Sequence, residues 1–160
     1  MTAGATDTPR VVLDTNAVLD WLVFREPSAL ALGHAIGQRR WTWCATPAML
    51  DELRWVLARP LALRWESAQK LALTIDLEAL ATLIEASVPA PGDALVCRDP
   101  ADQMFIDLAL GCSPCWLVSR DKALLALRRR AAARGVVIAP PALWQRAHAA
   151  RQPAGENDAA

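Results

Sequence analysis

The sequence predicts an α/β fold in three layers, in which helices flank a central, mostly parallel sheet. Short apolar runs, such as residues 11–13 and 116–118, alternate with longer segments of helical pattern. The residues in these runs are consecutively apolar, which is typical of strands covered on both faces. Two of the runs end abruptly in polar and acidic residues. In open α/β sheets, the carboxyl ends of the strands are where ligands bind.

Strands are expected at residues 10–14, 41–45, 95–97, 116–118 and 136–138. Thr15 and Asn16 are expected to cap a first short helix over residues 17–22, and a second helix is expected at about residues 27–39. Trp41, Trp43 and Trp116 lie in expected strands, so we assign them to the core. Residues 1–9 are expected to form a flexible N-terminal arm, residues 10–150 a single domain, and residues 151–160 a disordered tail.

The later helices follow from turn and cap signals. Thr46 before Pro47 predicts the start of a helix that runs to about residue 59. One or two helices are expected over residues 66–86. Asp99 before Pro100 opens a helix to residue 111, and a helix over residues 122–134 is expected to end at Gly135. A short helix containing Trp144 completes the expected domain.

Composition narrows the functional classes. Seventeen basic residues balance seventeen acidic ones, so overall charge indicates neither a nucleic-acid-binding nor a membrane-binding protein. No secretory signal and no apolar run long enough for a bilayer occurs, so we expect a cytoplasmic protein with its four cysteines as thiols. Cys112 and Cys115 have the spacing of a zinc pair, but no second pair matches it. His34 and His148 lie far from the acidic motifs and are expected to be structural.

Four acids stand where the predicted elements can converge. Asp14 and Asp121 follow two strands, Asp102 lies in the first turn of a helix, and Glu52 lies at the border of a helix's apolar stripe. Each also has a purely structural explanation. Asp14 could be a turn residue, Asp121 a helix cap and Glu52 a surface charge. Asp102 could be the partner of Asp99 in a capping box. Crowded carboxylates stay ionised only when a cation neutralises them. Oxygen ligands without Cys or His favour Mg²⁺ or Mn²⁺ over Zn²⁺.

Four segments in order carry a family resemblance: VVLDTNAVL at residues 11–19, TPAMLDEL at 46–53, RDPADQMF at 98–105 and LVSRDKALL at 117–125. Together they resemble the Rossmann-like PIN-domain ribonucleases, particularly the branch of toxins from toxin–antitoxin systems. The resemblance implies metal-dependent hydrolysis of RNA phosphodiester bonds, leaving 5′-phosphate and 3′-hydroxyl ends. It also implies a cognate antitoxin protein and a homodimer as partners, and no membrane association.

The resemblance assigns the catalytic, metal-binding acids to Asp14, Glu52, Asp102 and Asp121. Its polar companions, which would orient ligands or touch substrate, correspond to Asn16 and Ser119. Arg120 and the basic run at residues 128–130 are candidates for phosphate contacts, and Asp99 could assist as a cap. The chain departs from the family at Gln103, where relatives often carry another acid.

Two other functions remain open from the sequence. One is a Mg²⁺-dependent phosphatase of another Rossmann-like class, whose nucleophilic-aspartate version commonly has a second aspartate where this chain has Asn16. The other is a PIN fold that has lost catalysis and serves as a binding module. The presence of all four acids argues against this second alternative.

Overall fold

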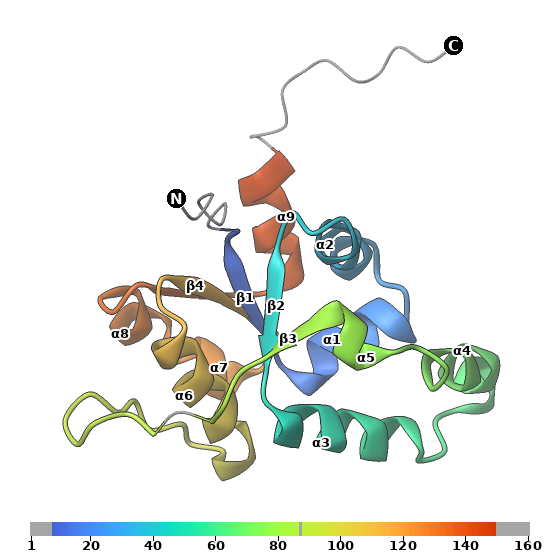
Figure 1. Cartoon of the computed structure of the whole chain (residues 1–160), viewed down its shortest axis with the longest axis horizontal. Coiled ribbons are helices and arrows are strands. Elements are labelled where there is room, and N and C mark those ends of the chain that lie inside the picture. Colours follow the sequence, from blue (N-terminus) through green and yellow to red (C-terminus); the bar gives the residue numbers. More distant parts are fainter. Residues whose placement is uncertain (1–7, 87, 150–160) are drawn as a thin grey trace, which may run out of the picture.

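A computed structural model describes residues 8–86 and 88–149, and in it five parallel strands form one sheet. The strands are β1 (Arg10–Leu13), β2 (Thr42–Ala45), β3 (Ala81–Leu83), β4 (Cys115–Val118) and β5 (Val136–Ala139). Their order across the sheet is β3-β2-β1-β4-β5 (Figure 1). The predicted α/β fold class is therefore confirmed. Residues 1–7 of the predicted arm and the predicted tail at 151–160 lie outside the described residues.

The sheet order creates a switch point between β1 and β4. From β1 the chain builds outward to β2 and β3, then returns to the other side of β1 for β4 and β5. β1 pairs with β4 along its whole length, from Arg10 opposite Cys115 to Leu13 opposite Val118. The loops that leave the carboxyl ends of β1 and β4 consequently turn in opposite directions. Between them they leave the crevice in which α/β proteins bind ligands.

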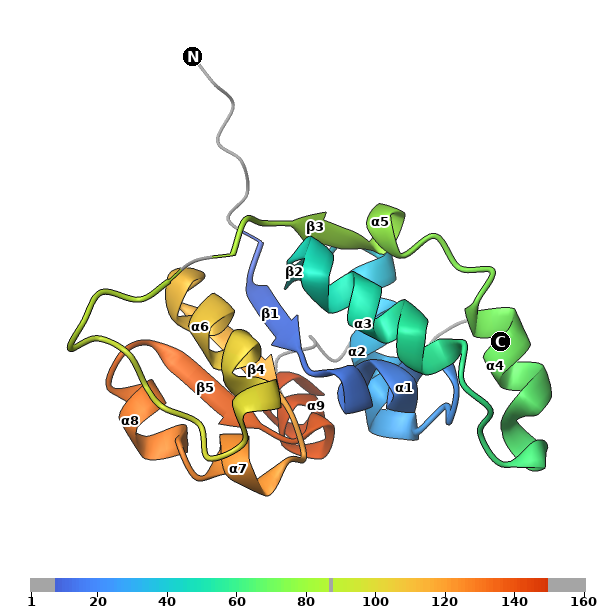
Figure 2. The ribbon, with the colours of Figure 1, turned by 90° about the horizontal axis from the view of Figure 1, so that it is seen from below.

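Helices cover both faces of the sheet. The helices are α1 (Thr15–Leu22), α2 (Pro27–Gly37), α3 (Pro47–Leu57), α4 (Glu66–Ala72), α5 (Leu77–Leu80), α6 (Gln103–Gly111), α7 (Lys122–Leu125), α8 (Arg128–Ala132) and α9 (Pro141–Ala149). Short 3₁₀ turns lie at Leu63–Trp65 and Pro100–Asp102. Figure 1 shows α6, α7 and α8 on one side of the sheet and α1 and α2 on the other. Figure 2 shows α6 beside β1 and β4, which it contacts.

The hydrophobic core lies between the sheet and the helices. Most of the apolar strand residues that the sequence predicted to be buried are buried. Val11, Val12 and Leu117 have no solvent exposure. Trp41 and Trp43 are buried as predicted, whereas Trp116 is only half-buried. Among the described helices, none has the length and apolar character that crossing a bilayer requires.

Two predicted elements differ from the structure. Residues 81–83, predicted as helical, form the edge strand β3, because Asp76 caps the four-residue helix α5 and the chain then extends beside β2. Residues 95–97, predicted as a strand, are irregular. Instead of pairing with a strand, the backbone bonds to one side chain: Gln103 accepts from the Cys97 amide at 2.8 Å and donates to the Leu95 carbonyl at 2.7 Å.

Three helix boundaries also differ. Asp14 caps α1, in place of the predicted Thr15 and Asn16. The expected helix over residues 122–134 is divided into α7 and α8 by a tight turn at residues 126–127. Gly135 lies three residues beyond the end of α8 rather than directly at a helix end, and its φ of +81° is one that favours glycine. A Cβ there would also lie 2.5 Å from the Ser113 hydroxyl oxygen.

Candidate active site

Asp14 lies at the carboxyl end of β1 and is almost completely buried, with 3% of its surface exposed. Its backbone amide donates to the Val118 carbonyl at 3.3 Å, which continues the pairing of β1 with β4. Its carboxylate accepts the Ala17 amide at 2.7 Å, as the N-cap of α1. The other carboxylate oxygen accepts a hydrogen bond from the Ser119 hydroxyl. The sheet and the cap therefore hold the Asp14 carboxylate in one orientation.

The charge of Asp14 is unfavourable in this position. The pKa of the Asp14 carboxyl is raised from 3.8 to about 6, and burial is the largest cause of the rise. The hydrogen bonds from Ser119 and Ala17 oppose this rise. The negative charges of Asp121 and Asp20 add to it. Near neutral pH the group is mostly ionised, at a cost to the free energy of folding.

Ser119 and Asp121 come from the end of β4, directly beside Asp14. Ser119 is fully buried, and its hydroxyl both donates to Asp14 and accepts from the Asp121 amide at 2.9 Å. Asp121 is the N-cap of α7 and accepts the Ala123 amide at 2.7 Å. The structural alternative for Asp121, a helix cap, is therefore true. It does not compete with a chemical role, because the capping contact occupies only one carboxylate oxygen.

Asp102 approaches the same place from the start of α6. Its Oδ2 atom is buried and has no hydrogen-bond partner among the described residues. Burial, and after it the negative charges of Asp121, Asp99 and Asp14, together raise the pKa of Asp102 from 3.8 to about 6. A buried carboxylate oxygen without a donor is costly unless a cation or a ligand satisfies it. Asp99, as predicted, is a cap, accepting the Ala101 amide at 3.0 Å.

Glu52 reaches the site through Thr15. It is half-buried on α3, and its carboxylate accepts a hydrogen bond from the Thr15 hydroxyl at 3.0 Å. Thr15 directly follows Asp14, so this contact joins α3 to the end of β1. Asp51, the neighbouring acid on α3, is exposed as the helical pattern predicted.

A cavity of about 540 Å³ lies beside the acids, and its described lining does not include the predicted basic run at residues 128–130. Asn16 and Arg120 both line it, together with Asp121. One Arg120 nitrogen donates to both carboxylate oxygens of Asp20, at 2.6 and 2.7 Å. Arg120 thus forms an ion pair between the β4–α7 loop and α1 through one nitrogen of a side chain that is more than half exposed.

Three residues of this region were not predicted from the sequence. Thr15 links Glu52 to the site, Asp20 pairs with Arg120, and Gln103 holds residues 95–97 against α6. Asp20 carries a signal that could have been used, since it is an acid among the apolar residues 17–22 of α1, and the structure shows it to be buried. A buried acid usually has a cationic partner. The roles of Thr15 and Gln103 depend on tertiary contacts and leave no such signal.

The donor set suits a hard divalent cation. The charge of Asp121 raises the pKa values of Asp14 and Asp102, and all three residues offer carboxylate oxygens. No group of three or more His, Cys, Asp or Glu side chains in residues 8–86 and 88–149 is arranged to hold a metal ion by itself. Mg²⁺ does not require one, because it is usually bound by one or two carboxylates and completes its shell with waters and substrate phosphates. The residues therefore fit such an ion.

Fold and side chains together define an α/β domain with carboxylates gathered at the switch point of a parallel sheet. A family model described as a PIN domain matches residues 10–123, more than half of the 160 residues. The chain belongs to the PIN-domain family, as its sequence motifs indicated. PIN domains are generally nucleases and typically use a divalent metal ion. No curated protein matches the chain.

Proposed function

We propose that this PIN domain is a metal-dependent endoribonuclease that hydrolyses RNA phosphodiester bonds, and that it is the toxin of a type II toxin–antitoxin pair. One observation carries the nuclease proposal. Asp14, Asp102 and Asp121 meet at the switch point, where burial and mutual repulsion raise the pKa of two of them to about 6. A cation stabilises such a group of carboxylates, and the bound cation can then attract a phosphate.

The chain's own residues prepare this site. The Ala17 amide and the Ser119 hydroxyl fix the two oxygens of Asp14, so little reorganisation is needed when a ligand binds. Ser119 also holds the backbone of Asp121, which couples the positions of two acids. Thr15 orients Glu52 in the same way. When bound to these acids, Mg²⁺ or Mn²⁺ would activate water and neutralise charge on the attacked phosphate.

Two exposed cations border the acids and suit an RNA backbone. Arg98 and Lys122 line the cavity of about 540 Å³ and form no ion pair with another described residue. Arg120 is occupied by Asp20, so we assign the phosphate contacts to Arg98 and Lys122 in its place. Asn16, exposed at the start of α1, offers an amide to the same substrate.

Cleavage of a mixed pool of labelled RNAs tests the nuclease proposal. Wild type should cut in Mg²⁺ or Mn²⁺ and not in EDTA, leaving 5′-phosphate ends. The Asp14→Asn and Asp102→Asn variants should be inactive although folded. The matched control is Asp51→Asn, which removes an exposed acid of α3 and should leave cleavage intact.

Other outcomes would replace the proposal. Turnover of a generic phosphomonoester without RNA cleavage would favour a phosphatase. No cleavage and no Mn²⁺ binding in calorimetry would favour a binding module without catalysis.

The toxin proposal rests on the four sequence segments described above. Expression of the wild type should arrest bacterial growth, and Asp14→Asn should not. A small protein encoded beside the gene should bind the chain and relieve the arrest. We also propose that the free protein is a homodimer. Light scattering should then give twice the monomer mass. Growth arrest that persists in Asp14→Asn would contradict a toxin acting through this site.

A further inference from the structure

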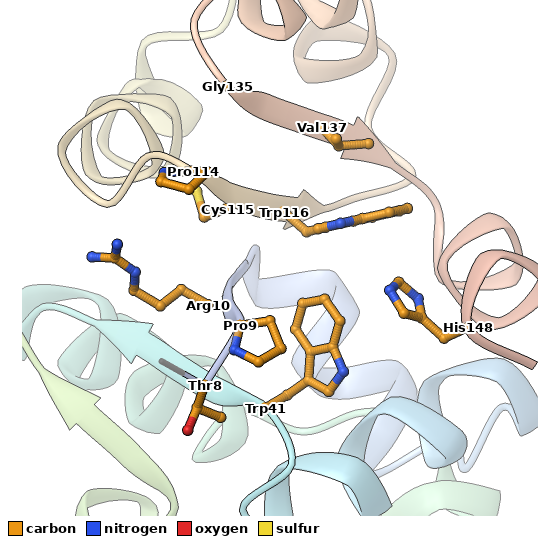
Figure 3. A pocket seen from close by; sticks show the side chains of 10 residues that line it. All are labelled: Thr8, Pro9, Arg10, Trp41, Pro114, Cys115, Trp116, Gly135, Val137 and His148. Atoms are coloured by element: carbon orange, nitrogen blue, oxygen red, sulfur yellow. The ribbon is translucent and has the colours of Figure 1, made fainter. Parts of the chain in front are cut away.

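A second cavity lies at the opposite edge of the sheet, where the strands begin. It has a volume of about 450 Å³ and is lined by Thr8, Pro9, Arg10, Trp41, Pro114, Cys115, Trp116, Gly135, Val137 and His148. In Figure 3, Trp116 and Trp41 lie on opposite walls, with His148 at one end and Arg10 at the other. The candidate active site does not use any of these residues.

Arg10 gives this cavity its charge. It is the first residue of β1, it is half-buried, and it forms no ion pair or side-chain hydrogen bond with the residues that the structure describes. A partly desolvated guanidinium without an anion is unfavourable, and its planar donors match a phosphate group. Among the described residues that line the cavity, none has an acidic side chain. The cation is therefore available to an anionic ligand.

The other end of the cavity is an aromatic wall held in place by its own contacts. The His148 ring stacks on Trp144 with centroids 4.8 Å apart and an interplanar angle of 28°. It meets Trp41 edge-on at 4.7 Å and Trp116 at 5.1 Å. Its Nδ1 atom donates to the Trp144 carbonyl at 2.7 Å, which fixes the ring in α9. Because Trp116 is only half-buried, part of its surface is accessible from the cavity.

We propose that this cavity binds a nucleotide, with its base against Trp116, Trp41 and His148 and its phosphate at Arg10. Aromatic side chains bind bases of any sequence by stacking, and arginine binds the phosphate. The volume lies within the usual range of small-molecule sites. The ligand could be a free mononucleotide or one nucleotide of an RNA strand, which share this chemistry. The site is separate from the proposed nuclease centre, because the four-residue strand β1 spans roughly 13 Å between Arg10 and Asp14.

Calorimetric titration of the full chain with AMP and UMP, in EDTA, tests the proposal without depending on cleavage. Wild type should bind both saturably, and Arg10→Gln should bind about tenfold more weakly or worse. Trp116→Leu should also lose affinity, and Trp116→Phe should retain most of it, provided that circular dichroism shows both to be folded. Arg64→Gln is the matched control, since Arg64 lies over Trp65 outside the cavity and its loss should change nothing.

Competition separates the two sources of ligand. A short single-stranded oligoribonucleotide that displaces AMP would identify an RNA nucleotide as the occupant, and failure to displace it would identify a free nucleotide. Equal affinity for ribose 5-phosphate and AMP would overturn the stacking half of the proposal. Absence of AMP binding, or binding that Arg10→Gln leaves unchanged, would overturn it entirely. RNA cleavage by Arg10→Gln should match wild type at saturating substrate, so failure here is distinguishable from failure of the nuclease proposal.

Discussion

Replacing Asp14 with Asn should abolish RNA cleavage and, in the absence of metal, make the protein more stable. The carboxylate of Asp14 is almost completely buried, and its pKa is raised from 3.8 to about 6. Above pH 6 the folded protein therefore holds a buried charge that the unfolded chain hydrates. Asn has the same shape without the charge, and its carbonyl oxygen can still accept the Ala17 amide.

The structure gives the size of the effect. A pKa raised from 3.8 to about 6 corresponds to about 3 kcal/mol of lost stability once the group is ionised. The side-chain nitrogen of Asn, which would stand in place of the second carboxylate oxygen, cannot accept the Ser119 hydrogen bond, and this loss costs about 1 kcal/mol. Asp14→Asn should thus raise the free energy of unfolding by about 2 kcal/mol at pH 8. Because the pKa of Asp14 is higher in the folded state than in the unfolded chain, wild type loses stability as the pH rises from about 4 to 6. The stability advantage of Asp14→Asn should therefore appear over this range and be absent at lower pH.

Urea denaturation in EDTA at pH 4, 6 and 8 measures this difference. Adding Mg²⁺ at pH 8 should make wild type the more stable of the two proteins. The ion stabilises the folded wild type by binding to it, and it should bind more weakly to the variant, which lacks the Asp14 carboxylate. Asp51→Asn, at an exposed position, should show neither effect. A variant less stable than wild type at pH 8, or a difference that does not depend on pH, would refute the claim that burial of the Asp14 charge destabilises the fold.

Three further predictions concern the residues around the acids. Ser119→Ala removes a hydrogen bond that lowers the pKa of Asp14, so the acid limb of the pH–rate profile should move to higher pH, with about 1 to 3 kcal/mol lost in denaturation. Arg120→Leu leaves Asp20 buried without its cation and should cost about 2 kcal/mol, less than in a fully buried pair because Arg120 is more than half exposed. Adding Asp20→Asn to Arg120→Leu should recover most of that loss, and no recovery would contradict the ion-pair account. Gln103→Glu cannot donate to the Leu95 carbonyl and should destabilise the protein by about 1 to 3 kcal/mol in thermal unfolding, whereas an unchanged midpoint would show that this contact is unimportant.

The sequence predicted the fold wherever burial alone determines structure. The central strands β1 and β4 are consecutive apolar residues that any two-sided sheet would bury, and both were expected. The edge strand β3 was missed because residues 81–83 are few, two of them are exposed, and they continue a helical pattern. Residues 95–97 are a short apolar run typical of a strand, but the Gln103 amide satisfies their backbone instead. A contact between one side chain and a distant backbone is not visible in local periodicity.

The candidate site was predictable for a topological reason. The carboxyl ends of parallel strands lie at one edge, so the positions of Asp14 and Asp121 after two such strands predict that they meet. The contact between Thr15 and Glu52 could not be predicted, because it depends on how α3 crosses the end of β1. The pairing of Arg120 with Asp20 likewise joins residues 100 positions apart, so the order of the elements does not predict it.

The sheet order also determines when the candidate site can assemble during synthesis of the chain. β1 is made first but lies in the middle of the sheet, and β4, which covers one of its sides, comes much later. Ser119 follows Asp14 by 105 residues, which a ribosome adds in about 5 to 20 s. Throughout that interval the nascent chain carries Asp14 without Ser119 or Asp121. A cell is therefore exposed to the assembled site only after most of the chain has left the ribosome.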